Sequence, residues 1–245
     1  MARFVLVHGA FGGAWAWSEI ARELESHGHE TLAIDLPGGG EDQTPIEGVT
    51  LESCAARVCE ALEDSAEPSI LVGHSMGGVV ITQAAARFPE RVALLAFVAA
   101  FMPRDGQSLL DLTQLPEGAG DQVQASITVV GDPPVAKRAP GGAANVMQYA
   151  TPEQLALVEE KGRDQAVAVF ATPVSIPPGA LDGIRRVYVH TTEDRAIKPA
   201  LQQRMIRENP CVDVVELATD HSPNFSMPTE LLAALLSFAE LASAI

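Results

Sequence analysis

The sequence is poor in cysteine and in basic residues, and it has no long apolar run. Its cysteines, Cys54, Cys59 and Cys211, are odd in number and lack the spacing of metal ligands, so neither a disulfide framework nor a metal site is indicated. No apolar run reaches the roughly 18 residues of a membrane-spanning helix. Only 16 Lys and Arg residues stand against 32 Asp and Glu residues, which gives a formal net charge of −16. Because nucleic acids and anionic membranes repel such a surface, neither is expected as a partner.

The chain begins without room for a targeting segment. Residues 1–3 lead directly into the apolar run 4–7, which leaves no charged segment, apolar segment and cleavage site in succession. We therefore expect a cytoplasmic protein. With 245 residues, of which 47% are hydrophobic, the chain can bury one large core and carry an inserted subdomain.

Residues 69–80 are the most informative stretch of the chain. They read as a buried strand, a serine between glycines, and a helix of small residues. In the order Gly73-His74-Ser75-Met76-Gly77, the serine would stand at the tip of a tight strand-to-helix turn, where backbone crowding leaves no space for side chains at the glycines. A Gly-x-Ser-x-Gly match carries little weight alone, and an ordinary Ser/Gly turn is the alternative. The flanking strand and helix favour an exposed nucleophile.

Apolar strands alternate with helical patterns along most of the chain. Apolar runs without strict alternation are typical of parallel strands that are covered on both faces. The alternation predicts an α/β architecture, with a mostly parallel sheet of about six strands and helices on both faces. The predicted strands are residues 4–7, 30–36, 69–72, 91–99, 186–190 and 212–217. The predicted helices are residues 17–24, 51–62, the segment from Ser75 to Arg87, and the segment that begins at Pro228.

Residues 103–182 interrupt this rhythm. They are rich in proline and glycine and hold only short helical pieces, such as 151–158 with Thr151 as N-cap. Because a structureless loop of this length is improbable in a compact domain, we predict an inserted lid that walls the substrate site. A separate second domain is the alternative, although such a segment offers little core of its own. The predicted division is a core of residues 1–102 and 183–245 with an inserted lid of residues 103–182.

The polar loops after three predicted strands supply the groups of a serine nucleophile. A serine hydroxyl needs an imidazole to take its proton and a carboxylate to orient that imidazole. The carboxyl ends of parallel strands meet at one edge of the sheet. Ser75, Asp194 and His221 follow three such strands, in the chain order nucleophile, acid, base.

Other residues compete for two of these roles. Among the six histidines, only His221 follows the last strand in a polar loop, whereas His8 precedes a glycine loop and is expected to hold that loop. Glu193 is the immediate rival of Asp194. Asp220 is adjacent to the proposed base, and it is expected to point away from the imidazole or to cap its loop.

A tetrahedral intermediate also requires donors for its oxyanion. In this arrangement one donor is the backbone N–H after the nucleophile, at Met76, and the other comes from the loop after the first strand, at Ala10. A simple turn of small residues is the alternative for Ala10.

Taken together, these motifs resemble the α/β-hydrolase superfamily. They resemble in particular the branch of plant methylesterases, salicylate-binding esterases and hydroxynitrile lyases, with its bacterial esterase relatives. The resemblance implies the triad Ser75, Asp194 and His221 and the oxyanion donors Ala10 and Met76. Lyases of this branch carry threonine where Gly9 stands and lysine where Ser222 stands, so cyanohydrin cleavage is not expected. The motifs are residues 4–10, 13–15, 34–36, 73–78, 192–194 and 220–223.

We therefore expect a carboxylic-ester hydrolase that acts through an acyl-enzyme and requires no metal or organic cofactor. Its expected partner is a small-molecule ester, hydrophobic or aromatic, and the protein is expected to be a monomer or a homodimer. The alternatives are a hydroxynitrile lyase or cofactor-free oxygenase on the same fold, or a ligand-binding receptor with slow turnover. Five side chains are candidates for the substrate pocket, although each would also suit the core: Phe11, Trp15, Phe101, Met102 and Phe170.

Overall fold

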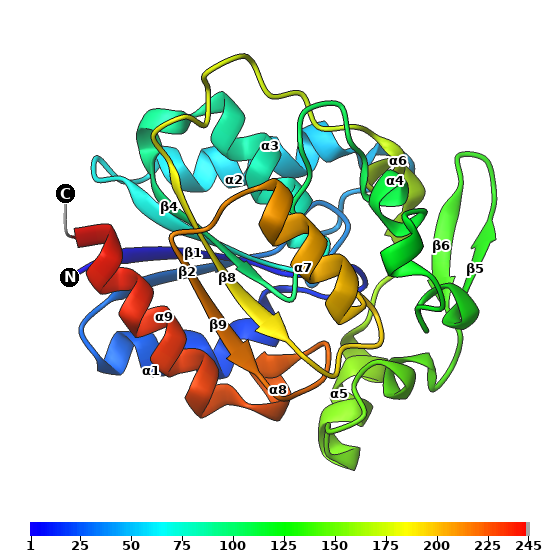
Figure 1. Ribbon diagram of the computed structural model, residues 1–245. Helices are drawn as coiled ribbons and strands as arrows, with labels where there is room; N and C mark the ends of the chain where they lie inside the picture. The colour runs from blue at the N-terminus through cyan, green and yellow to red at the C-terminus, as the bar shows by residue number, and fades with distance from the viewer. Residues whose placement is uncertain (244–245) are drawn as a thin grey trace.

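A six-stranded parallel sheet forms the centre of the molecule (Figure 1). The computed structural model describes residues 1–243, so the last two residues of the predicted third segment lie outside the described residues. The strand order is β2-β1-β3-β4-β8-β9, and every neighbouring pair is parallel. This confirms the predicted sheet of about six strands. Its strands are β1 (Arg3–Val7), β2 (Glu30–Ile34), β3 (Ser69–His74), β4 (Val92–Val98), β8 (Arg185–Thr191) and β9 (Asp213–Leu217).

Helices cover both faces of the sheet, as predicted (Figure 1). On one face, α1 (Ser18–Ser26) and α9 (Pro228–Ser243) pack side chains such as Leu24 and Phe238 against Phe4 of β1. The other face is covered by three helices, α2 (Leu51–Glu63), α3 (Gly77–Arg87) and α7 (Pro199–Glu208). The sequence reading did not predict α7.

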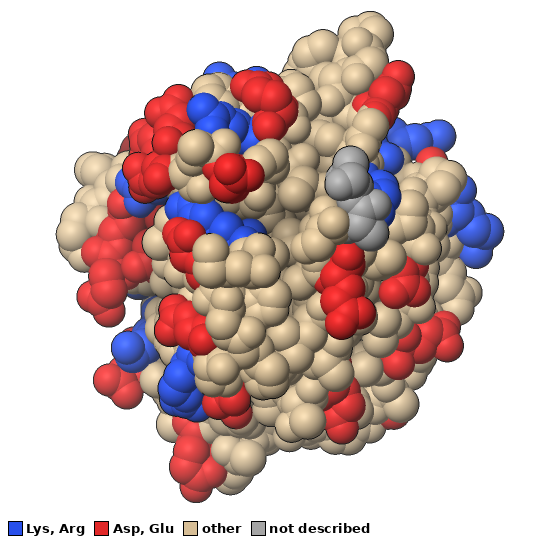
Figure 2. Space-filling model, turned by 90° about the vertical axis from the view of Figure 1, so that its left-hand side faces the viewer, with Lys and Arg blue, Asp and Glu red and all other residues tan. Residues whose placement is uncertain are grey.

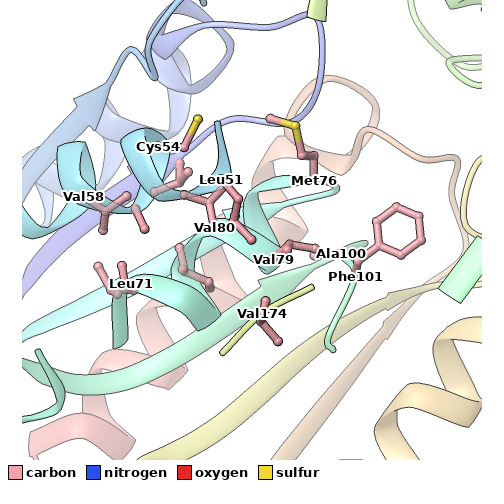
Figure 3. Close-up of a cluster of buried hydrophobic side chains, with 14 of the residues drawn as sticks. Leu51, Cys54, Val58, Leu71, Met76, Val79, Val80, Ala100, Phe101 and Val174 are labelled. Carbon is pink, nitrogen blue, oxygen red and sulfur yellow. The ribbon is translucent and has the colours of Figure 1, made fainter. Parts of the chain in front are cut away.

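The second face holds the core beneath the Ser75 turn. Leu51 and Val58 of α2 pack with Val80 of α3, and all three are at most 1% exposed. Figure 3 shows Met76 and Phe101 at the end of this cluster that lies away from Val58. The beginning of α3 is therefore seated on a filled core, which fixes the direction in which the preceding turn projects.

Residues 103–182 add a second, smaller sheet and several short helices (Figure 1), and side chains such as Leu112 and Val169 are part of the main core. A three-stranded antiparallel sheet has the order β5-β6-β7, and its β5–β6 hairpin was not predicted. The predicted helix at 151–158 is present, and the Thr151 side chain accepts a hydrogen bond from the N–H of Gln154. The elements of this segment are α4 (Leu109–Thr113), β5 (Ile127–Val130), β6 (Val135–Arg138), α5 (Pro152–Lys161), β7 (Gln165–Ala166) and α6 (Val167–Ala171).

Acidic side chains are spread over the surface. On the face shown in Figure 2 they extend from top to bottom, with Lys and Arg side chains between them. This distribution matches the net charge of −16. No helix described within residues 1–243 is both long enough and apolar enough to cross a membrane.

Candidate active site

Ser75 lies at a strained turn between β3 and α3. Its φ of 54° is in the left-handed region, which a non-glycine residue rarely adopts. A Cβ atom on Gly73 would lie 2.7 Å from the carbonyl carbon of Gly77, so the crowding expected from the sequence is present. The main chain of Ser75 is held from both sides, because its N–H donates to the Val98 carbonyl (3.3 Å) and its carbonyl accepts from the N–H of Phe101 (3.1 Å). The hydroxyl is thereby presented at the carboxyl edge of the sheet.

The structure brings Ser75, His221 and Asp194 together. Ser75 Oγ lies 2.9 Å from His221 Nε2, and His221 Nδ1 lies 2.8 Å from Asp194 Oδ2. His221 follows β9 and Asp194 follows β8, so the three side chains come from loops at the same edge of the sheet. Asp194 is 2% exposed and His221 is 7% exposed. Each distance permits a hydrogen bond, so a proton can pass from the hydroxyl to the imidazole while the carboxylate orients the ring.

The carboxylate of Asp194 is fully occupied. Oδ1 accepts hydrogen bonds from the N–H groups of Ala196 (2.7 Å) and Ile197 (2.9 Å). Besides His221, Oδ2 accepts from the Thr191 hydroxyl and from Gln202 Nε2, both at 3.0 Å. These donors hold the carboxylate in one orientation, with Oδ2 towards the imidazole.

Neither rival acid contacts the imidazole of His221. Glu193 accepts a hydrogen bond from the hydroxyl of Tyr149. Asp220 Oδ1 accepts from the N–H of Ser222 (3.0 Å), and its Oδ2 accepts from the N–H of Tyr149 (2.9 Å). Asp220 therefore caps its own loop, as expected from the sequence, and also ties that loop to the inserted segment.

Two further histidines stand beside the site. The His8 ring is held between the Gly9 carbonyl, 2.8 Å from Nδ1, and the N–H of Leu36, which donates to Nε2 at 3.1 Å. Its burial lowers its pKa. His8 thus holds the glycine loop, as predicted. Nε2 of the His74 ring lies 2.8 Å from the carbonyl oxygen of His221.

The N–H groups of Ala10 and Met76 are free to serve a ligand. Among residues 1–243, no hydrogen bond from either group is found. Both residues line a cavity at Ser75, and Met76 stands directly before α3, where the helix dipole favours negative charge. Gly9 packs closely against Ser75, since a Cβ atom on Gly9 would lie 2.9 Å from Ser75 Cβ.

Two cavities meet at Ser75. The smaller has a volume of about 130 Å³ and is lined by His221, Trp15 and Met147. The larger has a volume of about 330 Å³ and is lined by Met76, Phe101 and Phe170 but not by His221. Their further lining residues, which the sequence reading did not single out, include Val146 and Phe225 in the smaller cavity and Leu109, Ile127 and Ile197 in the larger. No helical or strand periodicity in the sequence distinguishes these positions from core.

Four of the five candidate pocket residues border these cavities, and one does not. Phe11 borders both cavities, Trp15 borders the smaller, and Phe101 and Phe170 border the larger. The placement of Met102 was wrong. It lines a separate cavity of about 220 Å³. The reason is that the chain holds Met102 towards α7, where its N–H donates to the sulfur of Met205.

Within residues 1–243, no group of three or more His, Cys, Asp or Glu side chains is arranged to hold a metal ion.

Comparison with known proteins identifies the family. The model of the alpha/beta hydrolase family matches residues 4–235. The chain belongs to the α/β hydrolase family. Methylesterase 7 of Arabidopsis thaliana is 32% identical over 257 residues, which cover 97% of this chain and 96% of that protein. Methyl jasmonate esterase 1 of Vitis vinifera is 31% identical over 251 residues, which cover 97% of this chain and 96% of that protein. The predicted resemblance to the plant methylesterase branch is confirmed.

Some relatives are considerably longer than this α/β hydrolase. Putative methylesterase 13 of Arabidopsis thaliana, named as chloroplastic, is 32% identical over 253 residues, and these cover 98% of this chain but only 56% of that protein. The chain therefore spans about half the length of that relative. The cytoplasmic location of the present protein stays a prediction.

Solved structures show the same fold. Tomato methylketone synthase I complexed with 2-tridecanone has a TM-score of 0.88 and 29% sequence identity, and the match covers 99% of both chains. A pyrethroid hydrolase from Sphingobium faniae has a TM-score of 0.88 and 27% identity, covering 98% of this chain and 97% of that one. These matches confirm the predicted α/β-hydrolase fold.

Proposed function

We propose that this protein is a carboxylic-ester hydrolase with Ser75 as nucleophile, His221 as general base and acid, and Asp194 as the carboxylate that orients the imidazole. The observation that carries the proposal is the continuous chain of two hydrogen-bond distances, 2.9 Å from Ser75 Oγ to His221 Nε2 and 2.8 Å from His221 Nδ1 to Asp194 Oδ2. The names of the relatives, methylesterase 7 and methyl jasmonate esterase 1, support the same class of reaction.

The proposed reaction has two halves. Ser75 Oγ attacks the ester carbonyl carbon while its proton moves to His221 Nε2, and the N–H groups of Ala10 and Met76 bind the oxyanion. The C–O bond to the alcohol then breaks, and His221 Nε2 gives its proton to the leaving oxygen. Water attacks the acyl-enzyme in the same way, and the carboxylic acid leaves with Ser75 regenerated. Asp194 stabilises the imidazolium in both halves.

The two cavities indicate which part of the ester lies where. The leaving oxygen must lie near His221 Nε2, so the alcohol belongs in the cavity of about 130 Å³ that His221 lines. The acyl group then extends into the cavity of about 330 Å³ on the Met76 side. Because the lining of that cavity is largely apolar, the preferred substrate carries a bulky apolar acyl group and a compact alcohol. The bound 2-tridecanone of the tomato methylketone synthase structure supports an apolar chain in such a site.

Residues 103–182 act as the lid in this proposal. Leu109 and Phe170 of this segment line the acyl cavity, and Met147 lines the alcohol cavity. The segment therefore selects both parts of the ester. The lyase alternative lacks support, since Ser222 stands where a lysine would be needed to stabilise the leaving cyanide.

The test is hydrolysis of p-nitrophenyl esters of increasing acyl length by the wild type, Ser75→Ala and the exposed control Ser18→Ala. We expect activity that rises with acyl length, a loss of at least about 10³-fold in Ser75→Ala, and no change in the control. Equal activity of Ser75→Ala and wild type would overturn the proposal. Oxygen uptake that survives Ser75→Ala would indicate the oxygenase, and tight ligand binding with negligible turnover would indicate the receptor.

A second series separates the two cavities. Methyl esters of increasing acyl length are compared with acetate esters of increasingly bulky alcohols. We expect kcat/KM to rise along the first series and to fall along the second. The reverse order would place the acyl group in the smaller cavity and would overturn the assignment.

A further inference from the structure

His74 contacts the proposed base, His221, through the main-chain carbonyl of that residue as well as through its ring. It is the last residue of β3, and its Nε2 lies 2.8 Å from the carbonyl oxygen of His221, a residue 147 positions later in the chain. The two rings also lie against each other, with centroids 4.9 Å apart and planes tilted by 43°. Trp17 packs edge-on against His74, with ring centroids 6.3 Å apart. The His74 ring thus contacts both a core indole and the catalytic loop.

The partner of Nε2 determines the tautomer of His74. A carbonyl oxygen only accepts hydrogen bonds, so Nε2 must carry the proton, and Nδ1 carries the lone pair. Burial, reinforced by the neighbouring His221, lowers the pKa of His74 to about 3. The other titratable groups that act on it are Asp194 and His8. His74 therefore remains a neutral donor while His221 gains and loses its proton.

The main chain of His221 has two tethers to other elements. Its carbonyl accepts from His74, and its N–H donates to the Val146 carbonyl at 3.3 Å. The second tether comes from the inserted segment, whereas His74 belongs to the same strand and turn that carry Ser75. His74 is adjacent to Ser75 in the chain and holds the main chain of His221. The position of His221 Nε2 relative to Ser75 Oγ therefore depends on His74.

We propose that His74 is a positioning residue of the reaction: its Nε2–H holds the main chain of His221 so that the imidazole stays within hydrogen-bond distance of the Ser75 hydroxyl. The proposal rests on the proposed function of Ser75 and His221. An ordinary packing role for the imidazole would need only its volume, whereas the positioning role needs the donor at Nε2. This difference makes the two roles separable by substitution.

The experiment compares His74→Leu, which keeps apolar volume and removes the donor, with His74→Gln, whose side-chain amide can place a nitrogen donor near the position of Nε2. The matched control is His190→Leu, which removes a buried histidine from the neighbouring region of β8, where its ring contacts Glu216. We expect kcat for p-nitrophenyl butyrate to fall by about 10²-fold in His74→Leu with little change in KM. His74→Gln should recover most of kcat, and His190→Leu should retain it.

Proton–nitrogen NMR of the histidine rings provides a readout that does not depend on activity. In the wild type we expect His74 as the Nε2–H tautomer throughout the range from about pH 5 to about pH 8. The His221 Nδ1 proton, shared with Asp194, should be lost from the spectrum in His74→Leu and retained in His74→Gln. This readout applies even if the wild type hydrolyses no ester, which would refute the proposed function alone.

Three results would overturn the positioning role. They are a kcat of His74→Leu equal to that of the His190→Leu control, a His74→Gln variant no more active than His74→Leu, or an Nδ1–H tautomer of His74 in the wild type. If His74→Leu does not fold, the tautomer and the His74→Gln variant still decide the question.

Discussion

Replacing Asp194 with asparagine tests the proposed acid most sharply, because the structure determines how the amide must turn. If the amide nitrogen took the place of Oδ1, it would face the N–H groups of Ala196 and Ile197, which would both lose their acceptor. Two buried unsatisfied donors cost about 2–6 kcal/mol in total. If it took the place of Oδ2, the Thr191 hydroxyl could rotate and accept from it. Gln202 Nε2, which donates to Oδ2, would lose that acceptor but keep the carbonyl oxygens of Ile197 and Thr191. The second orientation is therefore favoured.

That orientation changes the tautomer of His221. An amide NH₂ opposite Nδ1 requires Nδ1 to accept, so the ring proton moves to Nε2, where it blocks transfer from the Ser75 hydroxyl. A comparable change of tautomer in a serine protease lowers kcat by about 10⁴-fold, and we expect a loss of this size in Asp194→Asn. The fold should persist, because the N–H groups of Ala196 and Ile197 keep their acceptor and Gln202 keeps other partners.

The matched control is Asp220→Asn. Asp220 is equally buried, but it bonds the N–H groups of Ser222 and Tyr149 rather than the imidazole. Its replacement loosens the loop without changing the tautomer, so we expect a loss of only about tenfold. Both variants are assayed for kcat with p-nitrophenyl butyrate and for thermal unfolding. A loss of about 10⁴-fold in Asp220→Asn together with near-normal activity in Asp194→Asn would refute the reasoning and name Asp220 as the acid.

Acid should destabilise the protein through His74, whose pKa of about 3 in the folded state lies below the ordinary histidine pKa of 6.5. Between these values the unfolded chain binds the additional proton, so stability falls as the pH decreases, by about 2 kcal/mol from roughly pH 7 to pH 5. Urea titrations should show a smaller decrease in His74→Gln, and an equal decrease would contradict the assignment. Gly9→Ala should lower kcat by about 10²-fold, because its Cβ would lie 2.9 Å from Ser75 Cβ. Gly48→Ala, whose Cβ would have no neighbouring atom within 4 Å, should leave kcat unchanged. Equal kcat of the two variants would contradict the proposed steric effect at Gly9.

The strands and the order of the site residues could be predicted because they depend on local patterns. Strands buried on both faces require nearly continuous apolar runs, and such runs mark β1, β3, β4 and β8 directly. The Ser75 turn is equally local, since glycine is required at two of its five residues because the backbone of the turn is crowded there. These features require no knowledge of distant contacts.

The features that were missed depend on contacts between distant segments or on patterns inside a broken segment. The hairpin of β5 and β6 has a readable strand at Ile127–Val130 followed by the turn residues 131–134, but the surrounding prolines and glycines obscured it. Met102 was misplaced because adjacent residues of an irregular loop can face different cavities, and only the packing against Met205 decides which. The contact between His74 and the His221 carbonyl joins residues 147 positions apart, beyond any local pattern.

The three proposed catalytic residues are held by different parts of the molecule, and this has a consequence for substrate selection. Ser75 is fixed by β4 and the loop that follows it, through Val98 and Phe101. Asp194 is fixed largely by its own loop and by Gln202. The loop of His221 is bonded to the inserted segment through the Val146 carbonyl and through the Asp220 contact with the N–H of residue 149. The loop of Asp194 is bonded to the same segment, because the Arg195 carbonyl accepts from the N–H of Gln122 and the Glu193 carbonyl accepts from Gln148 Nε2, both at 2.8 Å.

Changes in the inserted segment can therefore act on the base and on the cavities together. A substitution that reshapes the cavity wall at Leu109 or Phe170 leaves these tethers intact and should alter KM and substrate preference. A change within residues 146–149 should lower kcat for every ester, because it releases the loop of His221. A change of substrate range is thus compatible with a constant chemistry where the main-chain contacts of residues 122 and 146–149 with the loops of Asp194 and His221 are kept.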